Sequence, residues 1–366
     1  KNFLMCCLSS LVFLIEKFHH GDILVFLTGK NDIDFIGHHL YFLKTLNLNK
    51  KGIIIVPIFS GLPWKTQMKS IQISKKKRKI ILSTNITETS LTIPNISFIL
   101  DPGLMKHQIF DPRKLAGDLI LTHIGKVNAI QRKGRAGRVR PGKCFRLYTK
   151  WSFQNEMEIL SVPEVKKIDL SHIVLFLKVL GIEDISSLEW IDFPEKFSLI
   201  HSFEVLYLLK ALGKDGQITN LGRKMSEFPV NPMLGKTIIS GLEFKREKEI
   251  LRIISLLLIP FNSYHSMFKN NPGGRFDKML SDHILLGVIF QDWENSGFSF
   301  EWCLKNKVDF KNMKLSKDIN FQLLKTGKKI KKKIICKTTP KQILDIIGSC
   351  FFLNFAILKS KSFYMP

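Results

Sequence analysis

The chain has 366 residues, of which 45% are hydrophobic and 24% are charged. Those proportions exclude an intrinsically disordered protein, and the length suffices for about two or three domains that each bury a core. The formal net charge of +25 at pH 7 favours a polyanionic partner, most simply nucleic acid. The chain is also rich in Ile, Phe and Asn and poor in Ala, so part of the lysine excess is expected from a general compositional bias.

Cysteine and histidine give no indication of a metal site. The six cysteines show no CxxC spacing, so we expect reduced thiols and an intracellular, reducing location. The neighbours His19 and His20, like His38 and His39, fit no metal-binding spacing and are expected in loops or at the surface.

An apolar run, residues 3–15, opens the chain. It has the length of the hydrophobic part of a signal peptide, but it lacks a small-residue cleavage site, and the helical pattern continues through Glu16 and Lys17. It is too short to cross a bilayer. We therefore expect a buried helix and no membrane association. Because the chain does not begin with Met and its last apolar segment, 343–358, shows no closure, we also expect a partial sequence.

From Gly21 onward the pattern is that of an α/β domain. Short, continuous apolar runs predict strands buried on both faces, with helices between them, and hence a parallel sheet covered on both sides. The expected strands are 23–27, 53–57, 80–84 and 96–100. A helix capped by Asn31 or Asp32 follows the first strand, and another passes through Gln67 and Ile71. The first of these helices carries three apolar residues on one side: Ile33, Ile36 and Leu40.

Polar segments follow three of these strands, at 28–29, 84–92 and 101–103. Since parallel strands end at a common edge, where open α/β sheets place their ligands, these segments predict a ligand site. Two extended segments between Lys106 and Thr122 flank residues 111–114, which predicts a protruding hairpin.

The chain beyond Tyr148 reads as mostly helical. The expected helices are 173–180, 203–212, 247–259 and 282–295, and a small hairpin or wing is expected at 216–222. A helix, wing and helix of this size are typical of a winged-helix module. Between Lys325 and Lys341 there are eight lysines and no acid, which indicates either a solvated face or linker, or a surface that contacts a phosphate backbone.

The most basic, glycine-spaced stretch of the chain is 131–143, with four arginines and two lysines. Gly134 and Gly137 would each weaken a helix by about 1 kcal/mol relative to Ala, so the spacing favours a segment whose backbone approaches something closely. Arg135 and Arg138 can then face the same way and bind phosphate oxygens in bidentate fashion. A basic surface turn is the alternative.

These segments together resemble motifs of the DEAH-box RNA helicases, of the splicing type. Residues 21–29 (GDILVFLTG) look like motif IV, residues 83–93 (STNITETSLTI) are similar to motif V, and residues 131–138 (QRKGRAGR) are similar to motif VI. The resemblance continues through 141–149, 221–229 and 281–283, and through Trp293, Trp302 and Cys303, so that it covers nearly the whole chain in the order of the family.

The resemblance implies an α/β domain followed by mainly α domains. Residues 1–150 would form a second RecA-like helicase domain, 151–230 a winged helix, 231–333 a helical ratchet domain, and 334–366 the truncated start of an OB-fold. The family's first RecA-like domain would be missing, because the chain contains neither a GxxxxGK[ST] phosphate loop nor an Asp-Glu-Ala-His segment.

Functional roles follow from the same resemblance, position by position. Gln131 would lie near the attacking water, and Arg135 and Arg138 would contact the γ-phosphate of ATP. The residues implied in nucleotide binding are Asp101, Gly134, Thr89 and Ser90. The residues implied in RNA phosphate contacts are Thr28, Gly29, Thr84, Asn85 and Thr92. For Asp101, a capped strand end is an equally good reading of the sequence.

Three positions depart from the family pattern: Lys133 replaces a small residue, Gln72 stands about where the family often has an aromatic that stacks on adenine, and Ser281 replaces a glycine. The implied activity is ATP-dependent 3′-to-5′ unwinding or remodelling of RNA and RNP, in splicing or ribosome biogenesis, by a nuclear protein. ATP and Mg²⁺ would be cofactors, with the Mg²⁺ ligands mostly in the missing first domain. Single-stranded RNA, a G-patch activator protein and a larger complex that holds the protein as a monomer would be its partners.

Two other hypotheses remain open at this point. A non-catalytic RNA-binding or scaffold protein derived from such a helicase would keep the basic surface, but it would have no use for Gln131, Arg135 and Arg138 together. A generic basic α/β domain would leave the ordered run of motifs unexplained.

Overall fold

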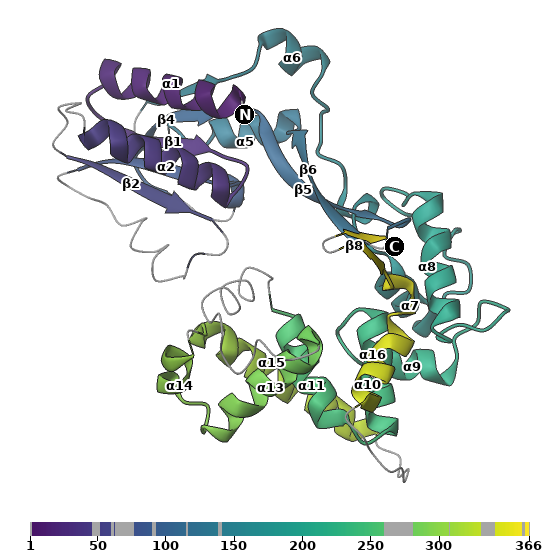
Figure 1. The fold of residues 1–366 in the computed structure, drawn as a ribbon. Coiled ribbons are helices and arrows are strands. Elements are labelled where there is room, and N and C mark those ends of the chain that lie inside the picture. Colours follow the sequence, from purple (N-terminus) through teal and green to yellow (C-terminus); the bar gives the residue numbers. More distant parts are fainter. Residues whose placement is uncertain are drawn as a thin grey trace. The chain divides into compact units, whose positions relative to one another are not determined.

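The computed structural model describes residues 2–45, 52–59, 62, 77–89, 93–114, 116–137, 141–259, 281–306, 308–330, 341–360 and 363–365. They fall into two compact units, each of which is described by itself (Figure 1). The first unit comprises Lys1–Ile109 and Gly117–Lys167, and the second comprises Phe110–Ala116 and Ile168–Pro366.

A five-stranded parallel sheet organises the first unit, with the strand order β2-β3-β1-β4-β7. Its strands are β1 (Asp22–Phe26), β2 (Ile53–Ile58), β3 (Arg78–Ser83), β4 (Ile96–Asp101) and β7 (Lys143–Arg146). The first four confirm the strands expected from the apolar runs. The apolar pattern does not reveal β7, because its four residues include only two apolar ones.

Helices cover both faces of this sheet. Those of the first unit are α1 (Asn2–Lys17), α2 (Lys30–Thr45), α4 (Ile86–Thr89), α5 (Lys126–Lys133), α6 (Lys150–Asn155) and the 3₁₀ helix η1 (Glu164–Lys166). On one face, Leu11 and Leu14 of α1 and Ile36 of α2 share a core with Val25 and Leu82. On the other face, Ile86 of α4 packs on the sheet, together with Ala136 in the segment after α5. The buried N-terminal helix is thereby confirmed.

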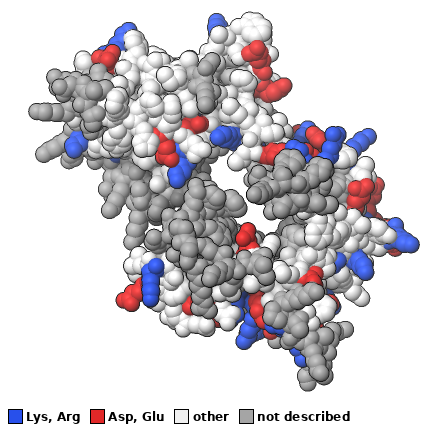
Figure 2. All heavy atoms as spheres, in the orientation of Figure 1, with Lys and Arg blue, Asp and Glu red and all other residues white. Residues whose placement is uncertain are grey.

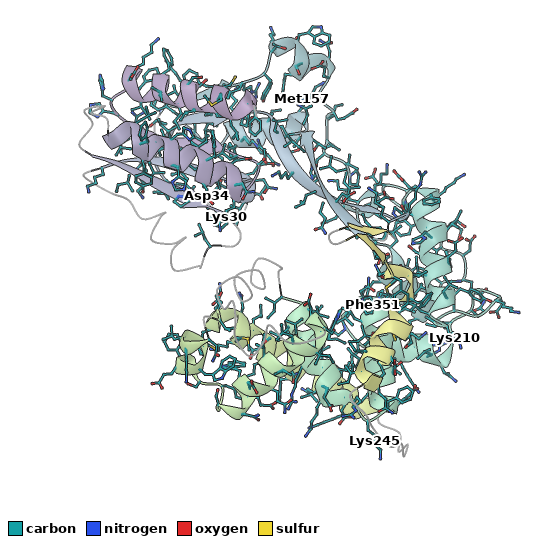
Figure 3. The ribbon with its side chains drawn as sticks, in the orientation of Figure 1. Lys30, Asp34, Met157, Lys210, Lys245 and Phe351 are labelled. Carbon is teal, nitrogen blue, oxygen red and sulfur yellow. The ribbon has the colours of Figure 1, made fainter. Side chains whose placement is uncertain are left out.

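The start of α2 differs from the expectation. The helix begins at Lys30 (Figure 3), so Asn31 and Asp32 lie in its first turn and do not cap it. Asp32 instead accepts a hydrogen bond from the Thr28 hydroxyl, and the Ile33 N–H donates to the Gly29 carbonyl over 3.1 Å. The predicted apolar side is confirmed, since Ile33, like Ile36 and Leu40, is buried.

The predicted hairpin is present as β5 (Leu104–Asp111) and β6 (Ala116–His123). The Asp111 carboxylate accepts the Arg113 N–H over 3.0 Å and so stabilises the turn between them. Residues at the tip belong to the second unit, where the Arg113 guanidinium lies 5.7 Å from the centre of the Phe197 ring.

The second unit is built mainly from helices. They are α7 (Ser171–Val179), α8 (Lys196–Leu208), α9 (Asn220–Ser226), α10 (Pro232–Glu243), α11 (Glu247–Leu257), α13 (Asp282–Asn295), α14 (Phe300–Lys305), α15 (Phe310–Ile330) and α16 (Lys341–Cys350). After α16 come the 3₁₀ helix η3 (Phe352–Asn354) and the hairpin strands β8 (Ile357–Ser360) and β9 (Phe363–Met365). Packing proceeds from neighbour to neighbour: α7 with α8 and α9, α10 with α9, α11 and α16, and α11 with α13 and α15.

The second unit has an aromatic core around α13, two sharp turns after α8 and α10, and a contact between α16 and α10. Trp293 and Phe290 of α13 lie at the centre of a core that Met313 of α15 completes. Lys210 and Lys245, which follow α8 and α10, have positive φ angles of 60° and 56° that turn the chain sharply (Figure 3). At the other end, α16 packs on α10 ahead of the β8–β9 hairpin.

The expected helices agree with the structure to different degrees. The bounds of α13 are those predicted, and α11 ends two residues earlier than expected. The predicted helix 203–212 was placed too late, because α8 begins at Lys196. The predicted wing was too long: the Thr219 hydroxyl caps α9 by accepting the Gly222 N–H, which leaves a turn closed by one bridge between Leu212 and Ile218.

The first compact unit continues past the boundary expected near residue 150, to Lys167. The Lys126 and Val127 N–H groups at the start of α5 donate to the carbonyls of Glu158 and Ile159, so this later segment is tied to the first unit. The helix expected through Gln67 and Ile71, and part of the lysine run at 331–340, lie outside the described residues. Among the helices that the structure describes, none combines the length and the hydropathy needed to cross a bilayer.

Candidate nucleotide and RNA site at the sheet edge

The candidate site begins where neighbouring strands end. Thr28 and Gly29 follow β1, Thr84 and Asn85 follow β3, and these two strands are paired from Ile23 to Phe26. The Leu27 N–H extends the pairing by donating to the Ser83 carbonyl over 2.7 Å. The structure therefore brings the predicted polar residues of motifs IV and V to the same edge of the sheet.

The polar groups at this edge are not equally available. Thr28 is only 8% exposed and its hydroxyl donates to Asp32, so it stabilises the start of α2. Gly29 and Thr84 are half-buried and Asn85 is exposed, so backbone and amide groups remain accessible to a phosphate. Ser90 and Thr92 lie outside the described residues, whereas Thr89 ends the short helix α4 with its side chain exposed.

A cation at this edge was not expected from the sequence. The Lys106 ammonium lies 3.5 Å from the position that a Cβ on Gly29 would occupy. Lys106 belongs to β5 and is exposed, so it can neutralise a phosphate bound beside Gly29. Sequence spacing gives no signal for this contact, since 77 positions separate the two residues and only the fold of the hairpin joins them.

Motifs V and VI are joined by a buried ion pair. Arg132 of α5 is 1% exposed, and its Nε donates to Glu88 of α4 over 3.0 Å. Its Nη1 donates to Asp101 at the end of β4 over 2.8 Å, and its guanidinium carbon lies 4.7 Å from the centre of the Phe26 ring at the end of β1. Asn128, one turn earlier in α5, donates to Glu88 over 2.5 Å. Arg132 of motif VI thus contacts motif IV through Phe26 and motif V through Glu88.

This cluster carries two carboxylates against one guanidinium, all but removed from water. A buried charge is tolerated when it is paired and hydrogen-bonded, and here the remaining oxygen atoms have partners as well. The Asp101 Oδ1 also accepts the Gly103 N–H over 3.0 Å, and the Tyr148 hydroxyl donates to Oδ2 over 3.2 Å. Burial, followed by the charge of Asp101, raises the pKa of Tyr148 well above its ordinary value, so this hydroxyl stays a donor.

The role implied for Asp101 is corrected by this geometry. Its side chain is 0% exposed, and its oxygens accept from Arg132, Gly103 and Tyr148, which leaves no surface for a nucleotide sugar. The other reading of the sequence, a capped strand end, describes it better. Arg132 and Glu88, which the sequence did not single out, are the residues that hold this part of the site together.

Motif VI divides into a helical part and a turn. Helix α5 ends at Lys133, and Gly134 closes it by donating its N–H to the Ile130 carbonyl over 2.9 Å. Gln131 and Gly134 are exposed and Arg135 is half-buried, whereas Arg132 points inward. Arg138 lies outside the described residues.

The glycine spacing of motif VI is explained by contact within the chain. A Cβ on Gly142, just before β7, would lie 2.7 Å from the Ala136 Cβ and 2.8 Å from the Gly137 nitrogen, and Gly137 has a φ of 83°. At Gly137 the backbone is thus approached closely by the chain itself, through Gly142. A Cβ on Gly142 would also lie 3.1 Å from the Ser97 carbonyl oxygen, near the start of β4, so this end of motif VI runs back from the carboxyl edge of the sheet.

The described residues at this edge are suited to binding an anion. Burial raises the pKa of Cys144, in β7, to about 11, so its thiol is protonated at neutral pH. Among the residues that the structure describes, no group of three His, Cys, Asp or Glu side chains is placed to hold a metal ion. The carboxylates nearest to the edge, Glu88 and Asp101, are paired with Arg132, so the described residues do not fit Mg²⁺ by themselves.

Comparisons with known proteins agree with this architecture. Residues 5–140 match the family described as the helicase conserved C-terminal domain, and residues 202–230 match the winged-helix helicase-associated domain HA2. The pre-mRNA-splicing factor ATP-dependent RNA helicase prp22 of Schizosaccharomyces pombe is 36% identical over 343 residues, which cover 92% of this chain and 29% of that protein.

The chain belongs to the DEAH-box RNA helicase family. It spans less than a third of the length of its prp22 relative. The crystal structure of the DExH-box NTPase HrpB of E. coli superposes with a TM-score of 0.72 at 24% identity, over 96% of this chain and 38% of that one. This likeness shows that the fold extends over nearly the whole chain. The resemblance drawn from motifs IV, V and VI is thereby confirmed.

Proposed function

We propose that this chain supplies the second RecA-like domain and the following helical domains of an ATP-dependent 3′-to-5′ RNA helicase that remodels RNA or RNP in the nucleus. The carrying observation is the Arg132 cluster, which holds motifs IV, V and VI together at one edge of the sheet. The naming of the prp22 relative as a pre-mRNA-splicing factor favours splicing over ribosome biogenesis.

Within that function the exposed side of motif VI binds the nucleotide. Gln131 orients the attacking water, and Arg135 and Arg138 stabilise the charge that develops on the γ-phosphate. Gly134, Thr89 and Ser90 line the nucleotide side. ATP, once bound with Mg²⁺, supplies the free energy of phosphoryl transfer, and most Mg²⁺ ligands belong to a first helicase domain.

RNA contacts fall on the neighbouring strand ends. Gly29, Thr84, Asn85 and Thr92 offer N–H, amide and hydroxyl groups to phosphates, and Lys106 adds a charge beside Gly29. Thr28 contributes indirectly, because its hydrogen bond to Asp32 holds the start of α2, next to Gly29, in position. The protein works as a monomer within a larger complex, a G-patch protein is its activator, and it does not bind membranes.

The decisive experiment uses the natural protein that carries this chain. The coding sequence upstream of Lys1 should encode a phosphate loop and an Asp-Glu-Ala-His segment, and the purified protein should hydrolyse ATP faster when single-stranded RNA is added. A start codon immediately upstream of the codon for Lys1, or RNA binding without any hydrolysis, would instead identify a non-catalytic RNA-binding scaffold.

A further inference from the structure

The segment through which the chain leaves the first unit lies against the helix that carries motif VI. We name residues 148–161 the exit segment; they follow β7, include α6, and end shortly before the second unit resumes at Ile168. A shift of the exit segment therefore displaces the point from which the main part of the second unit begins.

Hydrogen bonds join the exit segment to the first turn of α5. The Lys126 N–H donates to the Glu158 carbonyl over 2.8 Å, and the Val127 N–H donates to the Ile159 carbonyl over 3.1 Å. N–H groups in the first turn of a helix have no acceptor within that helix, so the exit segment satisfies them. The Lys126 ammonium also donates to the Gln154 carbonyl, over 2.8 Å. Lys126 thus holds the exit segment at two points.

Side-chain packing joins α6 to the middle of α5. Phe153 packs against a small core to which α5 contributes Ala129, a residue that is 0% exposed. The guanidinium carbon of Arg146, in β7, lies 4.5 Å from the centre of the Phe153 ring, a cation–π contact. Met157, farther along the exit segment, is buried as well (Figure 3). Helix α6 therefore cannot shift without disturbing the core that it shares with α5.

Tyr148, the first residue of the exit segment, joins it to the Arg132 cluster. Its hydroxyl donates to the Asp101 Oδ2 over 3.2 Å, and the Asp101 Oδ1 accepts from Arg132 over 2.8 Å. The space beside the Tyr148 ring is full, because a Cβ on Gly103 would lie 2.6 Å from it. A line of direct contacts thus runs from Arg132 of motif VI, through Asp101, to Tyr148. Helix α5 is held by the exit segment at its first turn and, through this line, near its last.

Surface electrostatics is a weaker means of connecting motif VI with the start of the second unit. On the face shown in Figure 2, Lys and Arg side chains are interspersed with Asp and Glu. Charges at a surface are also screened over about 8 Å at physiological ionic strength. Packed and hydrogen-bonded groups in direct contact can transmit a displacement farther than that.

We propose that the exit segment couples ATP hydrolysis at motif VI to movement of the second unit, with Tyr148 and Lys126 as the positioning residues. Both act through α5, whose last turn carries Gln131 of motif VI. Packed elements pass on a displacement because they switch between discrete arrangements instead of deforming gradually. This inference rests on the proposed function, because it needs a hydrolysis cycle, and it assigns a role to residues outside motifs IV to VI.

The test compares two rates in the natural protein that carries this chain. One is RNA-stimulated ATP hydrolysis, and the other is displacement of a labelled strand from an RNA duplex with a 3′ single-stranded overhang. Tyr148→Phe and Lys126→Met should each keep hydrolysis within about twofold of the wild type and slow displacement about 5- to 10-fold, the lower range for coupling between two sites. The ATP hydrolysed per displaced strand should rise by the same factor.

Trp151→Ala is the matched control, since its side chain lies on the same helix α6 but is 63% exposed. It should change neither rate. A merely structural role for Tyr148 and Lys126 would lower hydrolysis and displacement together, and calorimetry of each variant verifies that the fold is kept.

Hydrogen exchange read by mass spectrometry supplies an independent measurement. In the wild type, peptides from residues 148–161 should change their exchange rate when RNA and a non-hydrolysable ATP analogue are added, because α5 and the exit segment move together. In Tyr148→Phe most of that change should be lost, while peptides that cover motif VI still respond to the nucleotide.

Three results would overturn the proposal: displacement at the wild-type rate in both variants, hydrolysis that falls in step with displacement, or an exit segment whose exchange does not respond to nucleotide. The proposed function would survive all three. Its own failure would appear differently, as a wild-type protein without RNA-stimulated hydrolysis, and that result would overturn both.

Discussion

Motifs V and VI each have a buried part and an exposed part, and the two parts do different work. In the buried part, Glu88, Arg132 and Asp101 satisfy one another and exclude solvent. In the exposed part, Asn85 and Gln131 face solvent beside them. Residues one to three positions apart, such as Gln131 and Arg132 or Asn85 and Glu88, thus divide between holding the edge together and meeting a ligand. The difference teaches that a motif shared with a family marks a piece of structure, and that exposure decides which of its residues can touch a ligand.

The largest effect should come from Arg135, the half-buried arginine of motif VI. Arg135→Ala in the natural protein should lower the rate of RNA-stimulated ATP hydrolysis by about 10³- to 10⁵-fold, because an arginine that stabilises the transferring phosphoryl group contributes that much in comparable enzymes. Steady-state hydrolysis with saturating RNA measures it.

The matched control is Lys133→Ala, at an exposed position two residues away. It should leave hydrolysis within a few-fold of the wild type, and RNA affinity should be unchanged in both variants. If Arg135→Ala hydrolyses ATP as Lys133→Ala does, motif VI does not have the role proposed for it.

The buried part should respond in stability first. Arg132→Ala leaves Glu88 and Asp101 buried without their shared cation, and breaking a buried pair in this way costs about 3–5 kcal/mol. For a unit of this size that corresponds to a drop of roughly 6–20 °C in the unfolding temperature. Differential scanning calorimetry of the full chain measures it, and Lys133→Ala is again the control, with a change of about 0.5 kcal/mol or less.

A double variant makes this prediction sharper. Arg132→Leu with Glu88→Gln removes a charge of each sign and keeps the volume, so it should recover part of the loss that Arg132→Ala shows. An unfolding temperature for Arg132→Ala equal to that of the wild type would mean that the ion pairs contribute nothing to the fold.

Asn85→Ala tests the exposed part of motif V, with a smaller expected effect. Losing one hydrogen bond to an RNA phosphate should weaken RNA binding about 3- to 10-fold, the equivalent of roughly 1 kcal/mol. Anisotropy with a labelled single strand measures the affinity, and the unfolding temperature should not change. Weakened folding with unaltered RNA binding would place Asn85 with the buried part instead.

The sequence predicted the sheet and the motif positions well, because buried parallel strands are short apolar runs and their polar ends meet at one edge. It could not separate Arg132 from its neighbours, since nothing in QRKGRAGR states which arginine points inward. That follows from where α5 ends and from the approach of Gly142 to Ala136. Nor could it place Lys106 beside Gly29, a contact that only the folded hairpin creates.

The same limits explain which bounds in the second unit were predicted correctly and which were not. Helix α13 was predicted with its bounds because its apolar residues repeat regularly and an acid begins it. The wing was predicted too long because Thr219 reads equally well as a strand residue and as a cap, and the hydrogen bond from the Gly222 N–H decides for the cap. Local patterns thus fix the type of an element more firmly than its ends.

The smallest predicted effect concerns Asp22, at the amino edge of the same sheet. Its carboxylate accepts the Lys79 N–H over 2.8 Å, and partial burial raises its pKa above the ordinary value, against the opposing influence of Lys79 and Arg78. A raised pKa in the folded state means that Asp22 contributes stability below its unfolded pKa and that this contribution is lost as pH rises through the folded pKa. Asp22→Asn keeps an acceptor for Lys79 and removes the charge. The variant should therefore gain unfolding temperature relative to the wild type between about pH 3 and pH 7.

Asp184 supplies the control with the opposite sign. Hydrogen bonds from Ser186 lower its pKa, so its contribution is present above the unfolded pKa and is lost as pH falls through the folded one. Asp184→Asn should consequently lose unfolding temperature relative to the wild type over the same rise in pH, in the second unit instead of the first. If both variants shift in the same direction with pH, burial does not govern Asp22. The amino edge of the sheet would then be as permissive to charge as an exposed loop, and the contrast between buried and exposed charges would be confined to the Arg132 cluster.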